Sequence, residues 1–146
     1  MSTKVIIAGV MAGITSFLAG WLIWGMLLAK VTEGYSNMAC MRGMDDMNLP
    51  MIFVGQLIFG FFYAYIFSKW ATITTFAAGA TAGALLSGLM GLGFDLMMYA
   101  TTTMMNSLNV IAVDMAGNIV IGVIVGGLIG WWYGRDGGSR GAVKPN

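Results

Sequence analysis

The feature that most constrains the fold is a set of four long apolar runs that contain almost no charge. We expect spans at residues 5–29, 51–69, 74–98 and 112–133. About 20 apolar residues in a helix, rising 1.5 Å each, cross a hydrocarbon core of about 30 Å. The sequence therefore predicts an all-α, polytopic membrane protein with four transmembrane helices in a single domain.

Composition agrees with this class and argues against several functions. The chain is 58% hydrophobic and 9% charged, whereas soluble domains average about 25% charged residues. It has no His, so imidazole acid–base chemistry is excluded, and no nucleotide-binding or nucleophile motif is present. A net charge of +1 gives no reason to expect a nucleic-acid partner. We expect a protein that is not an enzyme and whose surroundings are membrane lipid.

Basic residues predict the orientation, because cytoplasmic loops carry an excess of Lys and Arg. One side of the membrane receives Lys4, Lys69, Arg135, Arg140 and Lys144. The other side receives Lys30 and Arg42. We expect a bacterial inner-membrane protein with both termini in the cytoplasm, an outer loop at residues 30–50 and a flexible cytoplasmic tail at residues 134–146.

An internal repeat is visible between the second and fourth runs. The segments are VGQLIFGFFYAYIFSKW at residues 54–70 and AGNIVIGVIVGGLIGWW at residues 116–132. They share Gly, an amide, small residues at every fourth place, and Trp. The first and third runs also match, through AGVMAG at residues 8–13 and AGATAG at residues 78–83. Both halves start on the same side, so the sequence predicts two tandem helical hairpins related as a parallel repeat.

Small residues at every fourth position favour close contact between helices in lipid. We expect a glycine zipper and a tight bundle with little room for a pore, and we expect Phe59, Phe62 and Phe67 to lie outside the seams. The glycines expected to pack are Gly60, Gly79, Gly83, Gly91, Gly122, Gly126 and Gly130. The four helices carry more glycine surface than one seam needs, which favours a homo-oligomer or docking on other membrane subunits.

Four polar residues gather toward the outer ends of the spans, and they are the candidate site. Asp95 and Asp114 lie at one level, on either side of the last outer turn, and Gln56 and Asn118 lie about one turn deeper. In the simplest interpretation, Asp114 lies in the first turn of its helix, where the helix dipole favours a carboxylate, and Asp95 is interfacial, hydrated or paired with Lys30 or Arg42. Alternatively, the two carboxylates share a proton or a cation, or they dock a partner's Lys or Arg.

The outer loop is rich in Met, which raises a metal hypothesis. The candidate ligands are Met38, Cys40, Met41, Met44 and Met47. Thioether and thiolate sulfur select Cu(I), and this short stretch resembles the external motifs of copper transporters. The alternative is that these flexible apolar side chains form a contact surface or cover the bundle mouth. We favour the alternative, and apart from Cu(I) we expect no cofactor.

The first run contains FLAGWLIWG at residues 17–25. With its length and four spans, the chain resembles small, uncharacterised bacterial four-span membrane proteins, a resemblance that implies no activity. Three functions are compatible with the sequence. The leading hypothesis is a small accessory or scaffold subunit of a larger assembly or homo-oligomer. The second is a small oligomeric transporter or channel that uses the carboxylates, and the third is Cu(I) handling by the outer loop.

Overall fold

The structure is a computed structural model that describes residues 2–32, 42, 44–69, 72–105 and 107–135. Its elements are α1 (Thr3–Leu22), a π-helical turn η1 (Ile23–Leu27), α2 (Ala29–Thr32), a 3₁₀ turn (Met44–Asp46), α3 (Leu49–Lys69), α4 (Phe76–Thr101) and α5 (Leu108–Gly134). Four helices are long and apolar enough to cross a membrane, namely α1 continued by η1, α3, α4 and α5. The predicted four-helix membrane fold is confirmed for the described residues.

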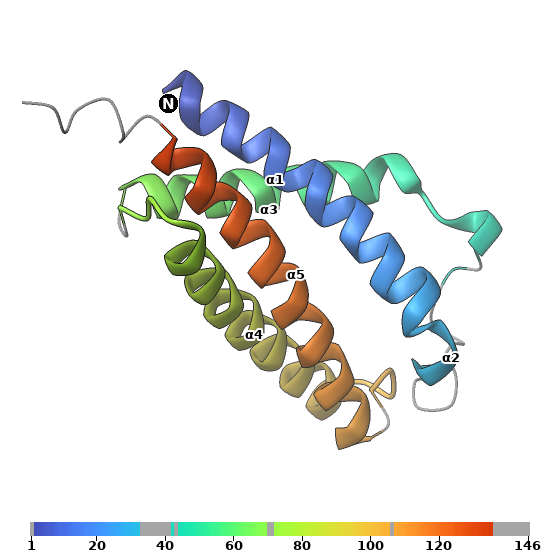
Figure 1. Ribbon diagram of the computed structural model, residues 1–146. Coiled ribbons are helices and arrows are strands. Elements are labelled where there is room, and N and C mark those ends of the chain that lie inside the picture. The colour runs from blue at the N-terminus through green and yellow to red at the C-terminus, as the bar shows by residue number, and fades with distance from the viewer. Residues whose placement is uncertain (1, 33–41, 43, 70–71, 106, 136–146) are drawn as a thin grey trace, which may run out of the picture.

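The helices pack as two hairpins that α1 and α5 hold together (Figure 1). The first hairpin is α1 with α3, the second is α4 with α5, and α1 also lies along α5. At the end where α1 begins and α5 ends, Lys4 Nζ donates to the carbonyl oxygen of Tyr133 at 3.0 Å. Trp132 Nε1 donates to the carbonyl oxygen of Lys4 at 3.3 Å. These bonds fix the start of the chain beside the end of α5.

The α4–α5 hairpin is built on backbone-to-backbone contact. A Cβ atom added to Gly79 would collide with the carbonyl oxygen of Gly126, and one added to Gly83 with that of Gly122. Gly130 continues the series against Gly79 and Thr75. Each step of four residues along α4 is thus matched by a step of four back along α5. This ladder of small residues brings the two helices as close as their backbones allow.

The α1–α3 hairpin uses fewer glycines. Gly60 of α3 meets the backbone of Gly9 and Gly13, but the other neighbour of Gly9 is the ring of Phe61. Next to this contact lies the apolar core, where α1, α3 and α5 converge, with the fully buried residues Ala12, Ala64 and Phe67. The expectation that Phe67 lies outside the packed seam is therefore wrong, because its side chain fills the junction of three helices.

The structural equivalents in the two hairpins differ by one helical turn from the residues that the sequence repeat aligned. In the first hairpin, Gly60 contacts both Gly9 and Gly13. The equivalents of Gly9 and Gly13 in the second hairpin are Gly79 and Gly83, and Gly126 contacts both of them. The sequence repeat paired Gly60 with Gly122, one helical turn earlier. A pattern that repeats every four residues matches itself again after one turn, so the sequence alone does not fix the register of the repeat.

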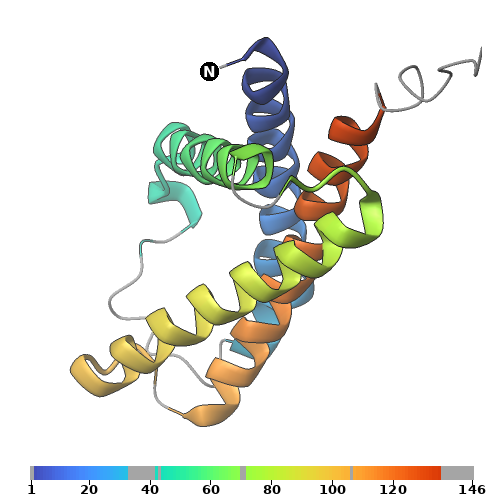
Figure 2. The ribbon, with the colours of Figure 1, turned by 90° about the vertical axis from the view of Figure 1, so that its left-hand side faces the viewer.

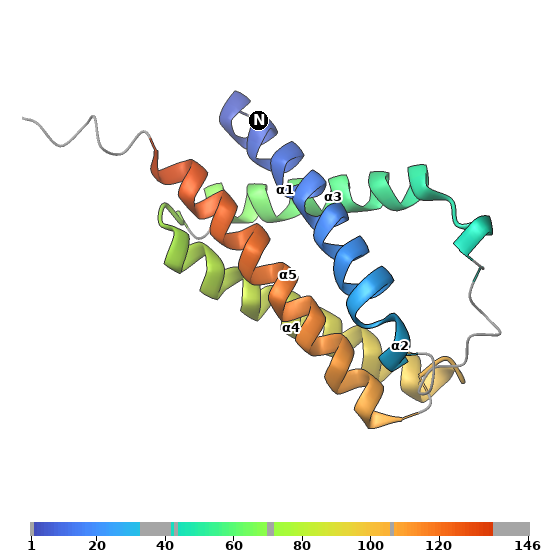
Figure 3. The same cartoon turned by 45° about the vertical axis from the view of Figure 1, so that its right-hand side comes forward.

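α3 and α4 are neighbours along the chain but diverge in space. They lie close near the connection between them and separate toward the start of α3 and the end of α4 (Figures 2 and 3). Because α3 runs across α1 instead of parallel to α4, a wedge-shaped space remains between the two hairpins. The candidate site lies in this space.

Candidate functional site

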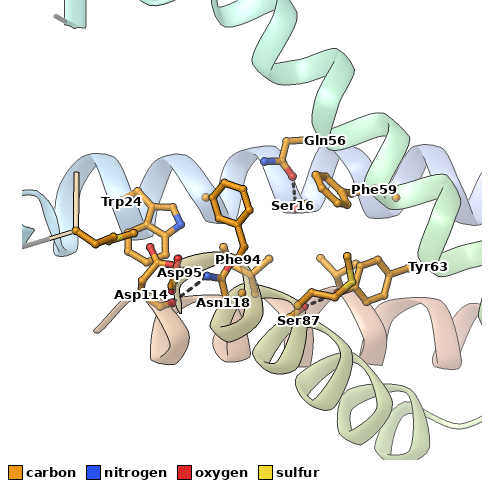
Figure 4. Close-up of a pocket in the computed structure, with 17 residues that line it drawn as sticks. Ser16, Trp24, Gln56, Phe59, Tyr63, Ser87, Phe94, Asp95, Asp114 and Asn118 are labelled. Atoms are coloured by element: carbon orange, nitrogen blue, oxygen red, sulfur yellow. Dashed lines mark hydrogen bonds between the residues drawn. The ribbon is translucent and has the colours of Figure 1, made fainter. Parts of the chain in front are cut away.

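A cavity of about 550 Å³ lies between the two hairpins (Figure 4). All four long helices contribute to its wall. The lining includes aromatic side chains (Trp24, Phe59, Tyr63 and Phe94) and polar ones (Ser16, Gln56, Ser87, Asp95, Asp114 and Asn118). The expectation of a tight interior is wrong here, because small residues pack helices closely within each hairpin and leave space where the hairpins splay apart. The sequence-predicted polar residues all line this cavity.

Asp95 and Asp114 stand at the end of the α4–α5 ladder. The last rung before them joins Gly91 to the side chain of Asn118, whose Nδ2 atom would lie 2.9 Å from a Cβ atom on Gly91. One step further along each helix, the carboxyl groups of Asp95 and Asp114 come within hydrogen-bonding reach of each other. Close packing of the glycines therefore forces two acidic side chains together.

The side-chain amide of Asn118 bonds twice to Asp114. Its Nδ2 atom donates to the backbone oxygen of Asp114 at 3.0 Å and also to the carboxylate atom Oδ2. Asp95 is only 2% exposed, and its Oδ2 atom has no hydrogen-bond partner among the described residues. The described lining of the cavity also contains no Lys or Arg.

This geometry corrects the simplest interpretation of the two acids. Helix α5 begins at Leu108, so Asp114 lies beyond its first turn and does not cap it. Asp95 lies six residues before the end of α4 at Thr101, and its side chain is buried. Two carboxylates in a confined apolar setting ionise together only at high cost unless a positive charge lies nearby. The site therefore needs a proton or a cation.

Two hydrogen-bonded pairs occupy the other side of the cavity. Ser16 Oγ donates to Gln56 Oε1 at 2.6 Å, which joins α1 to α3. The hydroxyl oxygens of Tyr63 and Ser87 lie 2.6 Å apart and join α3 to α4 near the closed end of the wedge. Gln56 thus lines the cavity but bonds to Ser16, away from the carboxyl pair.

Trp24 is the site residue that sequence reasoning missed. It belongs to η1, and π-helical turns are rare and often lie at functional sites. Its ring covers Gly117, where an added Cβ atom would lie 2.6 Å from Trp24 Cζ2. Figure 4 shows Trp24 beside Asp95 and Asp114. A π-helical turn leaves no periodic signal in the sequence, so only the structure reveals this placement.

The predicted copper ligands lie apart from this site or outside the described part of the chain. Met38, Cys40 and Met41 lie outside the described residues. Met44 begins the 3₁₀ turn, and Met47 follows it and is half-buried. The Cu(I) hypothesis stays a prediction.

Comparison with protein-family models, with curated proteins and with solved structures finds no match to this chain. The resemblance to bacterial four-span proteins accordingly stays a prediction from sequence. The cavity and its two carboxyl groups are the features of the structure that bear on function.

Proposed function

We propose that this chain is a small integral membrane transporter, without enzymatic activity, that binds a positively charged solute in the cavity between its hairpins. The observation that carries the proposal is the buried, unpartnered carboxylate oxygen of Asp95, beside Asp114, in a cavity of about 550 Å³ among membrane-spanning helices. Ionisable groups inside membrane spans are costly, and they commonly mark the paths of ions and substrates.

Charge balance supports a cationic solute. Two acidic side chains line the cavity without any basic side chain in its described lining. Two of the donors that line it are engaged elsewhere, since Asn118 bonds to Asp114, and Ser16 bonds to Gln56. A bound cation would neutralise the pair and would supply a partner for Asp95 Oδ2.

The transporter proposal ranks above the accessory-subunit hypothesis that the sequence favoured. That hypothesis relied on surplus glycine surface, but Gly60, Gly83 and Gly126 are used for contacts within the chain. We retain the proposed placement in a bacterial inner membrane with both termini in the cytoplasm. In that orientation the carboxyl pair lies toward the outer side of the membrane.

Cation-dependent stability tests the proposal. The chain is purified in an uncharged detergent, and its melting temperature is measured in sodium, calcium or benzyltrimethylammonium chloride at matched ionic strength. At least one cation should stabilise the wild type, by about 2.7 kcal/mol at one hundred times its dissociation constant. Asp95→Asn should lose the response.

The control is Asp45→Asn, which removes an exposed acid outside the cavity and should leave the response unchanged. The same cation should then accumulate in proteoliposomes that contain the wild type and not in those that contain Asp95→Asn. An identical response of wild type and Asp95→Asn to all three cations would overturn the proposal.

One observation favours the accessory-subunit role as a second candidate. The open side of the wedge is bordered by Phe59 and Phe94, which are 50% and 56% exposed. A partner helix could cover this side and place a Lys or Arg against Asp95. In that case one defined subunit with an intramembrane basic residue should copurify with the wild type in mild detergent. It should be lost both from Asp95→Asn and when its own basic residue is neutralised.

A further inference from the structure

We propose that the solute is an organic ammonium ion, which enters from the bilayer between α3 and α4 and binds between the carboxyl pair and the aromatic rings of Trp24 and Phe94. This inference rests on the proposed function and names its ligand class. Three features carry it: the chemistry of the cavity wall, the supply of oxygen ligands, and the side on which the cavity opens.

The wall beside the acids is aromatic. Trp24 from η1 and Phe94 from α4 line the same cavity as Asp95 and Asp114. In Figure 4 the Trp24 ring lies on the same side of the cavity as the carboxyl pair, and the Phe94 ring projects into the space toward Gln56. Aromatic faces attract an ammonium group through their negative potential, and Trp does so most strongly. Carboxylates and aromatic faces together suit a cation that carries apolar substituents.

The oxygen supply is too small for a bare metal ion. Calcium takes six to eight oxygen ligands, and magnesium needs octahedral coordination. Near the pair, the described side chains offer the carboxylates of Asp95 and Asp114 and the amide oxygen of Asn118, which is fewer than six oxygens, and one of the carboxylate oxygens already accepts from Asn118. Gln56 and the hydroxyl of Tyr63 are engaged with other side chains. An ammonium ion requires charge balance without a complete oxygen shell, so it fits this site better.

The opening favours a ligand that partitions into lipid. α3 and α4 diverge, and the side chains at the edge of the space between them are exposed and apolar, namely Phe59, Met90 and Phe94. A hydrophilic ion would have to cross the hydrocarbon region to reach the cavity by this side. The described lining contains no Lys or Arg that would bind a phosphate. This absence favours a free amine over an aminophospholipid headgroup, which offers the same ammonium chemistry.

Calorimetric titration of the full chain in uncharged detergent with benzyltrimethylammonium chloride tests the assignment. Wild type should bind. Trp24→Leu and Phe94→Leu should each weaken binding about tenfold. Asp95→Asn should weaken it about a hundredfold. The control Trp21→Leu removes an exposed ring outside the cavity and should bind as the wild type does. Phe94 is largely exposed, so its variant tests the assignment even if Trp24→Leu fails to fold.

Parallel titrations separate this inference from the proposed function. Binding of calcium or sodium, but not of benzyltrimethylammonium, with loss in Asp95→Asn would overturn the ammonium assignment and leave the cation proposal standing. Binding of no cation would overturn both. If phosphatidylethanolamine added to the micelles displaces benzyltrimethylammonium, the ammonium chemistry holds and the source is a lipid headgroup. If benzyltrimethylammonium binds Trp24→Leu and Phe94→Leu as tightly as wild type, the aromatic part of the site is wrong.

Discussion

The two hairpins resemble each other in sequence but hold their helices together differently. In α4–α5, backbone touches backbone at Gly79, Gly83 and Gly126, on successive rungs. In α1–α3, Gly60 and Gly13 make such contacts, whereas Gly9 lies against the ring of Phe61, and a hydrogen bond from Ser16 to Gln56 adds a polar link. The α4–α5 hairpin is fixed mainly by backbone contact, which does not adapt. The α1–α3 hairpin combines backbone contact with side-chain contacts, and the side chains can adapt.

This difference explains where the polar site lies. The rigid ladder of α4–α5 continues directly into Asp95 and Asp114, so packing along the rest of the hairpin determines how close the acids stand. The opposite wall is formed by α1 and α3, with Trp24 on a π-helical turn and Phe59 at the edge of the wedge. A fixed pair of charges thus faces an adaptable aromatic wall, an arrangement suited to a site that admits and releases a solute.

The largest expected effect comes from a methyl group placed within the rigid ladder. Gly83→Ala puts its Cβ atom against the carbonyl oxygen of Gly122, which cannot rotate away. We expect a loss of about 3 kcal/mol in unfolding free energy. Gly9→Ala meets the Phe61 side chain, which can turn, and should cost about 1 kcal/mol. Equilibrium unfolding in mixed micelles measures both.

The matched control on the same helix is Gly93→Ala, because no atom lies within 4 Å of the added methyl group. It should be neutral or slightly stabilising, since Ala forms helix better than Gly. If Gly83→Ala and Gly9→Ala cost the same, the contrast between a rigid and an adaptable hairpin is wrong.

The next largest effect is a gain in stability, expected when an acid at the end of the α4–α5 ladder is neutralised. Asp95→Asn replaces a buried carboxylate, whose Oδ2 atom has no partner among the described residues, by a neutral amide that can donate to Asp114. We expect the empty protein to gain about 1 kcal/mol in stability, because burying an unsatisfied charged group is costly. Asp114→Asn should gain less, since Asp114 already accepts from Asn118. The measurement is thermal unfolding in the absence of added organic cations, and a loss of stability in Asp95→Asn would indicate that this carboxylate is already compensated.

The sequence predicted the four spans, the glycine contacts and the shared level of the two acids. Charge-free runs predicted the four spans, and small residues at every fourth place predicted that Gly79 and Gly83 would lie in a helix contact. The equal height of Asp95 and Asp114 followed from counting residues up to the shared turn, and the structure brings the two together. These inferences depend only on helical geometry, which is the same for every helix.

The cavity and the position of Trp24 depend on how whole helices are placed relative to one another, which local sequence patterns do not encode. The direction in which α3 crosses α1 creates the cavity and buries Phe67. No local sequence pattern predicts that crossing direction. The start of α5 at Leu108, before the expected residue 112, moves Asp114 out of the first turn. Trp24 lines the same cavity from a π-helical turn, and its ring lies over Gly117. Gly55, which the repeat aligned with Gly117, has open space instead.

The smallest effect tests whether the two hairpins are independent units. The hydroxyl groups of Tyr63 and Ser87 lie 2.6 Å apart and link α3 to α4 at the narrow end of the wedge. Hydrogen bonds between membrane helices average about 0.6 kcal/mol in double-mutant cycles, so Tyr63→Phe should cost about that much. Tyr99→Phe, an exposed change on α4, should cost nothing measurable. A cycle with Ser87→Ala isolates the pair, and a coupling energy near zero would mean that the ladder and the α1–α5 contact alone set the width of the cavity. A coupling well above 1 kcal/mol would mean instead that this bond closes the wedge, and solute affinity in Tyr63→Phe should then change along with stability.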